Sequence, residues 1–527
     1  KMSSKRIRKV IDIAFSSLDE KEDFFQRWNK FRKRHPALKN SASAMSYLLS
    51  CEKQDFGNYE QTSEDSFNYN NFKTIDKERS KAEPLFECCP QSIQSLIEAV
   101  YRLGQLHYFK RDGVTSQIEQ FSNVVATFTI SNNHCTFTWK SSPYVKGGTK
   151  FFVNEKIACG TICSGILDSH FQRFTRASKL GNTSTTFIID VLKRISPAVS
   201  IQASLSMREA IDASEVRSAD NKLTLETDAC FSAFRNAQRS ITFALCNNTH
   251  TIVANKVKST KDPECPTVQQ HETISTDEIL QDLHDQGKQV RCIVHDSNNS
   301  VSKIICENFP DVNDQNGVWH KIKSAMSGFS KLTKGTKETE NITWHSQLID
   351  KYEGVKNHFW YSIMNCGNDA DILIDSLDAI VLHYQGEHEN CRLSSPCVRN
   401  PRYVPSRVLL TDPVAVKLLA DYITSTSIYK KPTFVLEGLT TSYVEAANNA
   451  LRSFLPKRQT FGDIAFQLRT NLFILDWNEN INRPFIRKTD PALDGTPREN
   501  SGRKYSTRKS YEYTQKIWEQ FLLEVPN

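Results

Sequence analysis

The sequence predicts an α/β protein, in which a mixed β-sheet core carries a large helical insertion and follows a mixed α+β N-terminal region. Short β-branched runs that end in polar residues fall between residues 221 and 294, with helical spacing between them. After Asn308 the apolar spacing is mostly helical as far as Trp477. A chain of 527 residues has room for about two to four domains. Its composition, 39% hydrophobic and 24% charged, is that of a folded protein.

The first 85 residues are predicted to form a basic helical segment at 1–50 and a linker at 51–85. Phe24, Phe25, Trp28 and Phe31 recur at helical spacing with basic residues between them. This helix either contacts DNA or a partner, or packs as an ordinary amphipathic helix. Residues 51–85 are polar and lack apolar periodicity, which favours a linker.

Residues 86–220 are predicted to form a mixed α/β domain that serves DNA binding or dimerisation. The expected elements are helix Gln91–Tyr101, strands Phe121–Ile130 and Cys135–Trp139, and helices Ile157–Arg173 and Thr185–Val199. The last helix is expected to end at Ser196-Pro197, because proline has no amide proton to donate within a helix.

Residues 221–324 and 437–480 are predicted to be two parts of one sheet core. The expected elements of the first part are strands Leu223–Thr227, Ser240–Cys246 and Thr251–Val257, helix Thr276–Gln286, strand Val290–Val294 and helix Ser300–Asn308. The polar residues 247–250 are typical of a hairpin turn between the second and third strands. An order of three strands, a helix, a strand and a helix is that of a ribonuclease-H-like mixed sheet with helices on both faces.

The helical insertion is predicted to span residues 325–436, and residues 481–527 are predicted to be a basic tail. Expected helices from the end of the first core part onwards are Trp319–Phe329, Trp344–Cys366, Asp369–Tyr384, Asp412–Thr424, Ser442–Phe454, Phe461–Trp477 and Tyr511–Leu523. The tail before the last of these helices is expected to be extended.

The charge distribution is compatible with a nucleic-acid partner. The net charge is +7, and residues 1–40 hold 12 Lys and Arg against 5 Asp and Glu. No run approaches the ~18 apolar residues of a membrane helix, so we expect no membrane partner. The 14 cysteines are scattered, which favours a reducing compartment, the cytosol or the nucleus. The leading Lys1 suggests a piece of a longer protein with a further domain upstream.

Three acidic residues occur in comparable contexts. Asp228 and Asp296 each follow a predicted buried strand, and Glu445 lies at the start of a predicted helix. Singly, each has an ordinary explanation, because Asp is common in turns and Glu in the first helical turn. Together they suit two-metal phosphoryl chemistry, in which divalent cations neutralise neighbouring carboxylates and activate water or a 3′-hydroxyl. Oxygen ligands favour Mg²⁺ or Mn²⁺.

The order Asp228, Asp296, Glu445, with a long helical stretch before the glutamate, resembles the DDE transposases of eukaryotic cut-and-paste elements. Among these transposases the amino-acid sequence is most similar to the Kolobok-like group, with hAT and Mutator-type enzymes as relatives. The matching pieces are Glu226-Thr227-Asp228-Ala229, Val294-His295-Asp296-Ser297-Asn298, Val318-Trp319-His320-Lys321-Ile322-Lys323, and Glu445-Ala446-Ala447-Asn448 followed by Pro456-Lys457-Arg458. A further piece is the segment Cys159–Arg173. The resemblance covers roughly residues 120–480.

This resemblance implies that Asp228, Asp296 and Glu445 bind the catalytic Mg²⁺ or Mn²⁺. His320 matches the histidine of a [Cys/Asp]-x-x-His motif, although Gly317 stands where that motif has Cys or Asp. His320 is therefore either an active-site residue or a packed histidine at a helix start. Asn448, one turn after Glu445, either supports the site or contacts DNA, or is a plain polar position.

The implied substrate is double-stranded DNA, both the terminal inverted repeats of a transposon and a target. Lys321, Lys323, Lys457 and Arg458 are expected to contact its phosphates. Cutting two ends in concert implies a homodimer or a larger homo-oligomer, working in the nucleus. Two other functions stay open: a domesticated, non-catalytic DNA-binding protein, which the Gly317 departure favours, and a ribonuclease-H-like nuclease.

A separate group of soft ligands lies in the predicted insertion. His383, His388, Cys391 and Cys397 fall within fifteen residues, enough for a structural, tetrahedral Zn²⁺. The order is not that of a common zinc finger. The segment is therefore either a zinc site or a polar loop with two free thiols.

Overall fold

The computed structural model describes residues 115–122, 125–131, 136–145, 149–178, 183–487 and 504–524. The predictions for the helical segment 1–50, the linker 51–85 and the helix Gln91–Tyr101 lie outside these residues. The chain divides into two units, Lys1–Glu83 and Pro84–Asn527, and the described residues all lie in the second.

A three-stranded antiparallel sheet begins the described part. Its strands, in the order β1-β2-β3, are β1 (Thr115–Ser122), β2 (Val125–Ser131) and β3 (Thr136–Lys140). The single predicted strand Phe121–Ile130 is wrong, because Phe121 and Ser122 belong to β1 and pair with Ala126 and Val125 of β2. Ser122-Asn123, a pair typical of turns, interrupts the apolar run at this point.

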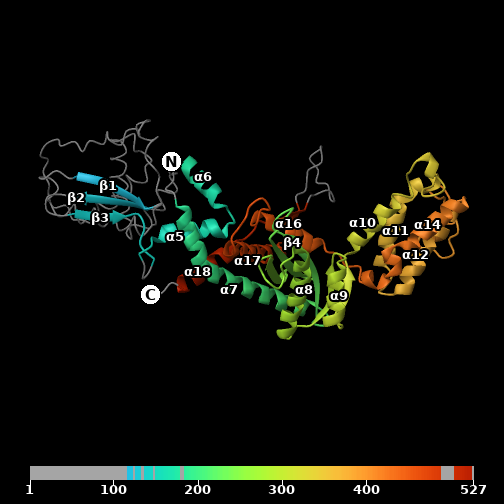
Figure 1. Ribbon diagram of the computed structural model, residues 1–527, viewed down its shortest axis with the longest axis horizontal. Helices are drawn as coiled ribbons and strands as arrows, with labels where there is room; N and C mark the ends of the chain where they lie inside the picture. The colour runs from blue at the N-terminus through green and yellow to red at the C-terminus, as the bar shows by residue number, and fades with distance from the viewer. Residues whose placement is uncertain are drawn as a thin grey trace, which may run out of the picture. The chain divides into compact units, whose positions relative to one another are not determined.

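Three helices that precede the central sheet in the chain and two that follow it pack together beside this sheet. They are α5 (Phe152–Cys163), α6 (Asp168–Ser178), α7 (Thr185–Arg217), α17 (Asp463–Asn480) and α18 (Glu512–Glu524). The predicted helix Ile157–Arg173 is two helices, since Gly165 between them has φ +73°, which ends a right-handed helix. Pro197 does not end α7, because the helix continues to Arg217 with its apolar face packed against α17 and α18 (Figure 1).

The central sheet has five strands in the order β6-β5-β4-β7-β8. They are β4 (Leu223–Phe231), β5 (Arg239–Cys246), β6 (Ile252–Ser259), β7 (Val290–His295) and β8 (Asn313–Asn316). β5 is antiparallel to β4 and β6, whereas β7 is parallel to β4 and β8. The fifth strand, β8, was not predicted, since its residues Asn-Asp-Gln-Asn have no apolar alternation. Helices α8 (Val268–Asp285) and α9 (Asn299–Asn308) connect the later strands.

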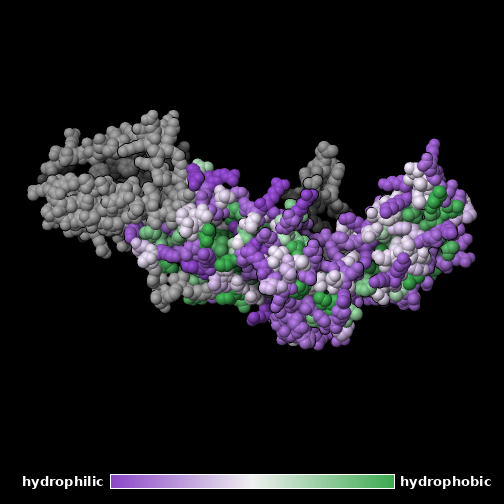
Figure 2. Space-filling view, viewed as in Figure 1, coloured by the Kyte–Doolittle hydropathy of each residue, from purple (hydrophilic) through white to green (hydrophobic). Residues whose placement is uncertain are grey.

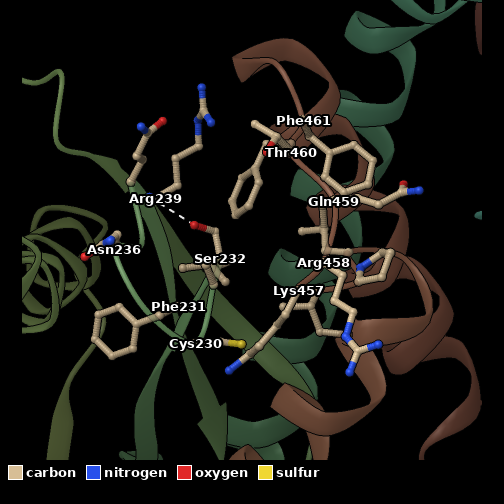
Figure 3. A pocket seen from close by; sticks show the side chains of 17 residues that line it. Cys230, Phe231, Ser232, Asn236, Arg239, Lys457, Arg458, Gln459, Thr460 and Phe461 are labelled. Atoms are coloured by element: carbon tan, nitrogen blue, oxygen red, sulfur yellow. Dashed lines mark hydrogen bonds between the residues drawn. The ribbon is translucent and has the colours of Figure 1, made fainter.

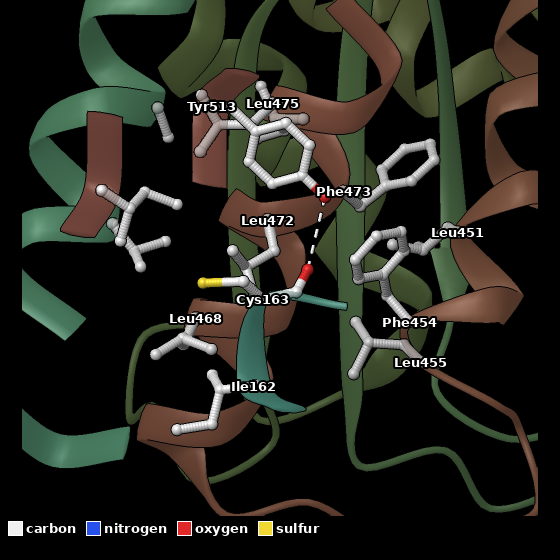
Figure 4. Close-up of a cluster of buried hydrophobic side chains, with 14 of the residues drawn as sticks. Ile162, Cys163, Leu451, Phe454, Leu455, Leu468, Leu472, Phe473, Leu475 and Tyr513 are labelled. Atoms are coloured by element: carbon white, nitrogen blue, oxygen red, sulfur yellow. Dashed lines mark hydrogen bonds between the residues drawn. The ribbon is translucent and has the colours of Figure 1, made fainter. Parts of the chain in front are cut away.

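β5 shows how the sheet is covered on both faces. All eight of its residues are buried. Ile241, Phe243 and Leu245 join the hydrophobic cluster of α5, α7, α16, α17 and α18, part of which Figure 4 shows. Ala244 and Cys246 join the cluster on the other face, with side chains of α8 and α9. Because successive side chains alternate between faces, a strand covered on both reads as a continuous apolar run.

The helices between β8 and α16 in the chain form a separate hydrophobic cluster, whose residues run from Val318 to Val435. The elements are α10 (Val318–Phe329), η5 (Lys337–Thr339), η6 (Ser346–Lys351), α11 (Tyr352–Met364), α12 (Ala370–Gln385), α13 (Pro396–Arg399), α14 (Pro413–Ser425), α15 (Ser427–Lys430) and η7 (Pro432–Val435). The chain then returns along β8, where the backbone amide of Glu437 donates to the side chain of Gln315 over 3.1 Å. It continues into α16 (Ser442–Ala450) and η8 (Leu451–Ser453).

A two-stranded sheet precedes the last helix of the described part. β9 (Phe485–Arg487) and β10 (Lys504–Ser506) pair antiparallel before α18. The exposed side of α8 is hydrophilic in Figure 2, in keeping with the alternation of buried and exposed residues along this helix. None of the helices in the described part of the chain combines the length and the hydropathy needed to cross a membrane.

Candidate active site

The sheet register brings the first two predicted acids together. β4 and β7 run parallel, and Glu226 pairs with Val294. Two residues further on, Asp228 lies within β4 and Asp296 directly follows the end of β7, so the two residues come to the same level of the sheet. The prediction that Asp228 follows its strand is wrong, because β4 continues to Phe231 and Asp228 pairs with Phe243 of β5. Side chains two apart on a strand share a face. Glu226, Asp228 and Cys230 therefore all point toward α16, which packs on β4.

Asp228 is held by Asn448 on α16. The Asn448 side-chain amide donates to Asp228 Oδ2 over 2.8 Å, and only 8% of Asn448 is exposed. Burial raises the pKa of the Asp228 carboxyl to about 7, and the negative charge of Asp296 adds to this shift. The hydrogen bond from Asn448 acts in the opposite direction. Asn448 thus supports the site from within the protein.

The other two predicted acids meet through His320. Its Nε2 lies 2.8 Å from Glu445 Oε1 and 3.3 Å from Asp296 Oδ1. The hydroxyl of Thr441 lies 3.0 Å from the same Asp296 oxygen and 3.1 Å from the same Glu445 oxygen. One ring N–H and one hydroxyl proton therefore serve two carboxylates. Asp296, His320 and Glu445 offer ligand atoms that all lie within 4.8 Å of one another, a group that could hold a metal ion. Asp228 is next to this group and not part of it.

Glu226 anchors the helix that carries Glu445. Its Oε2 accepts from the backbone amides of Tyr443 and Val444, at 3.3 and 3.4 Å, in the first turn of α16. Its Oε1 accepts from the Asn247 side chain over 2.8 Å. The first amides of a helix have no partner within the helix, and a carboxylate there is also favoured by the helix dipole. Burial raises the pKa of this carboxyl to about 7.

A tight turn between β7 and α9 presents Asp296. His295 is fully buried, and its Nε2 lies 2.8 Å from Asp314 Oδ1. Ser297 has φ +33°, an uncommon conformation for a residue with a side chain. Asn298 then caps α9 and donates to Glu272 on α8 over 3.0 Å. Burial raises the pKa of Glu272, and its charge in turn contributes to the raised pKa of Asp228.

The site contains more negative charge than the protein neutralises. Asp228, Glu272, Asp296 and Glu445 lie in one region, and no Lys or Arg among the described residues forms an ion pair with any of them. Neighbouring carboxylates in partly buried positions repel one another. The donor set, mainly carboxylate oxygens, fits a hard divalent cation.

Gly317, the departure from the expected motif, has a structural explanation. A Cβ at this position would lie 3.1 Å from Thr441 Oγ1 and 3.3 Å from Thr441 Cγ2. The backbone amide of Val318 also donates to Leu439 O over 2.9 Å, which holds the start of α10 against the segment before α16. Glycine thus permits the close approach of Thr441, which contacts both Asp296 and Glu445.

Replacing Gly317 by alanine is expected to lower the free energy of unfolding by about 1–2 kcal/mol, because the added methyl group overpacks this contact. Thermal unfolding measures the change. Gly160→Ala is a suitable control, since a Cβ at Gly160 meets nothing within 4 Å. In a double-mutant cycle, Thr441→Ser should recover part of the loss, because it removes Cγ2. Equal losses with threonine and serine at 441 would contradict the steric explanation.

The predicted DNA-contacting residues lie on two elements beside the acids. Lys321 and Lys323 are on α10 with His320. Lys323 is exposed, with its Nζ 4.5 Å from the centre of the Trp319 ring. Burial lowers the pKa of Lys321, and Lys431 lowers it further. Lys457 and Arg458 follow η8, and both line a pocket at the end of β4.

The four predicted zinc ligands also come together. His383, at the end of α12, and His388, Cys391 and Cys397 beyond it offer ligand atoms within 4.8 Å of one another. Cys391 Sγ lies 3.5 Å from His383 Nδ1 and 3.8 Å from His388 Nδ1. A tetrahedral ion with Zn–S of about 2.3 Å and Zn–N of about 2.0 Å places such atoms about 3.6 Å apart. The spacing therefore fits zinc.

Three residues of the active-site region were not singled out from the sequence. Glu226 is on the same strand face as Asp228, so the alternation Glu226-Thr227-Asp228 could have indicated it. Thr441 stands immediately before α16, where a hydroxyl side chain is common, and that position suggests a cap. Glu272 lies in mid-helix on α8, and nothing in its sequence context distinguishes it.

Comparison with known proteins finds a weak similarity to a solved structure. No protein-family model matches the chain, and none of the curated proteins compared with it matches significantly. Among solved structures, the chain is similar to the Drosophila P element transposase strand transfer complex. The sequence identity is 14% and the TM-score 0.30, over 64% of this chain and 94% of that one.

Proposed function

We propose that the chain is a DDE-type DNA transposase, whose Asp228, Asp296 and Glu445 act in metal-dependent strand cleavage and strand transfer. One observation carries the proposal: Asp296 and Glu445 come together at His320, Asp228 lies near enough for the charge of Asp296 to raise its pKa, and none of the three acids has a Lys or Arg partner among the described residues. The order β6-β5-β4-β7-β8, with β5 antiparallel to β4, supports a ribonuclease-H-like core. The Kolobok-like assignment rests on the sequence resemblance alone.

Mg²⁺ or Mn²⁺ would be held by Asp228, Asp296 and Glu445, and when bound would supply Lewis-acid activation of an oxygen nucleophile. The surrounding residues position these ligands. Asn448 orients Asp228, Thr441 and His320 hold Asp296 against Glu445, and Glu226 fixes the start of α16. His320 Nε2 also places a proton donor between two of the carboxylates.

The proposed substrates are the terminal inverted repeats of a transposon and a target duplex. Lys321, Lys323, Lys457 and Arg458 would contact phosphates, which gives salt-dependent binding with little dependence on sequence. Cleavage of two ends in concert requires at least two active sites. We therefore propose a homodimer or larger assembly, acting in the nucleus.

A strand-transfer assay tests this function. A plasmid that carries the inverted repeats expected to flank the gene is incubated with the protein and Mg²⁺ or Mn²⁺, and released ends and joined products are resolved on gels. Cleavage followed by joining, both abolished by chelation, is expected. Cleavage without joining would indicate a nuclease. DNA binding without cleavage under either metal would indicate a non-catalytic protein and overturn the proposal.

His383, His388, Cys391 and Cys397 would hold a structural Zn²⁺. The purified protein is then expected to contain about one zinc per chain, measured by plasma mass spectrometry. Cys391→Ser should abolish binding and lower the melting temperature by at least about 5 °C, because ligand binding stabilises the folded insertion. Cys306→Ser is the matched control, since Cys306 is exposed on α9. Equal zinc content in both variants would contradict the site.

A further inference from the structure

A pocket of about 290 Å³ opens beside Asp228, between the end of β4 and the loop from η8 to α17 (Figure 3). Cys230, which lines it, is two residues from Asp228 on the same face of β4. Asn448 touches both positions, because its side chain donates to Asp228 and its carbonyl lies 4.0 Å from Cys230 Sγ. Two strand residues span about 7 Å. The pocket therefore begins about one nucleotide of DNA backbone away from the acids.

The lining of this pocket is cationic and polar. Lys457 and Arg458 stand on one wall, and Figure 3 shows Lys457 extending toward Cys230. Arg239 on the opposite wall is already paired with Asp463, its Nε donating over 2.7 Å. No Asp or Glu among the described residues lines the pocket, and none forms an ion pair with Lys457 or Arg458. Two cations without an acidic partner among the described residues, beside a group of carboxylates, are suited to phosphate.

The same lining offers groups that suit a nucleobase. Asn236 and Gln459 present side-chain amides, which can both donate and accept hydrogen bonds to base edges. Phe234, next to the lining residue Ala233 in the chain, is 72% exposed, and Lys457 Nζ lies 5.1 Å from the centre of its ring. Exposed aromatic rings beside cations form stacking platforms for unpaired bases. A continuous duplex has no free base to place in such a pocket.

We propose that this pocket binds one unpaired nucleotide of the DNA strand next to the cleavage position, with its phosphate on Lys457 and Arg458. The proposal rests on the proposed function for the identity of the strand. It assigns the pocket a role in holding a frayed or freshly cut end, so that the adjacent phosphate stays beside Asp228 and Asp296.

Binding measurements with two DNA probes test the pocket without requiring cleavage. One probe is a duplex with a short unpaired 3′ overhang that contains 2-aminopurine, and the other is the same duplex with blunt ends. Both are titrated with the full chain in the presence of Ca²⁺. The overhang probe is expected to bind about tenfold more tightly, as one stacked base contributes roughly that factor. Its fluorescence should change on binding.

Filling the pocket provides the matched comparison. Ala233 lines the pocket, and Ala237 is in the same loop but does not line it. Ala233→Leu is expected to reduce overhang affinity to that of the blunt duplex, whereas Ala237→Leu should leave both affinities unchanged. As a second variant, Lys457→Gln should weaken overhang binding and lower its salt dependence by about one counterion. Lys516→Gln, an exposed lysine on α18, controls for general charge loss.

The outcomes separate the pocket from the proposed function. If the wild-type protein cuts and joins DNA but binds both probes equally, the pocket proposal fails and the function stands. If the overhang preference is present and sensitive to Ala233→Leu, while Mg²⁺ and Mn²⁺ support no cleavage, the function fails and the pocket remains a single-strand site. Equal effects of Ala233→Leu and Ala237→Leu would also overturn the pocket.

Discussion

Replacing Asp296 by asparagine is expected to reduce metal-dependent strand cleavage by about 10³-fold or more. Asp296 is the acid that links the others: it lies 3.3 Å from His320 and 3.0 Å from Thr441, and its charge adds to the raised pKa of Asp228. Its loss removes a ligand from the proposed cation site, whose charge stabilisation contributes several kcal/mol. A loss of that size corresponds to about 10³ in rate.

The measurement is single-turnover cleavage with Mg²⁺ and with Mn²⁺. Asp228→Asn and Glu445→Gln should behave alike, and all three variants should still bind DNA, because neutralising an acid does not weaken phosphate contacts. Asp311→Asn, in the loop before β8, is the control and should cleave at the wild-type rate. Wild-type cleavage by all three site variants would exclude Asp228, Asp296 and Glu445 as the catalytic set.

Glu226→Ala is expected to lower the free energy of unfolding by about 2–4 kcal/mol and to reduce cleavage about 100-fold. The substitution leaves the amides of Tyr443 and Val444 without their acceptor, and each unsatisfied buried donor costs about 1–3 kcal/mol. Glu445 is in the same helical turn. A shift of about 1 Å in a catalytic group can account for the lost rate.

Denaturant unfolding and the cleavage assay are both needed for this prediction. Glu226→Gln keeps an acceptor oxygen and should recover most of the stability and activity. Glu307→Ala removes an exposed glutamate from α9 and should change stability by less than about 0.5 kcal/mol. If Glu226→Ala loses stability no more than Glu307→Ala does, Glu226 does not anchor α16.

The sequence predicted those features that local pattern determines. Asp228 and Asp296 could be selected because each comes directly after a short apolar run, although Asp228 lies within β4 and only Asp296 follows the end of its strand. Glu445 needed the resemblance, since a glutamate in a first helical turn is ordinary. Its proximity to Asp296 depends on contacts made across 145 residues of chain, through Thr441 and His320.

Other features depend on tertiary context that no local pattern encodes. β8 is a strand of polar residues, and it forms because the edge of β7 offers hydrogen-bond partners from Cys292 to His295. Pro197 is tolerated inside α7 because packing along the helix offsets the one missing amide. The alternation along β4 places Glu226 on the same face as Asp228, but its contact with the first amides of α16 depends on the tertiary packing.

Because the residues at 317–318 lie in close contact with those at 439–441, the length of the insertion can change without moving the carboxylates of the candidate site. The chain leaves the core and re-enters it at almost the same point, so residues 319–438 form a closed excursion whose two ends are joined by Val318 and Leu439. Lengthening such an excursion adds little entropic cost, about 0.6 kcal/mol for each doubling. Homologous chains could therefore differ widely in this region while the carboxylates keep the same separation.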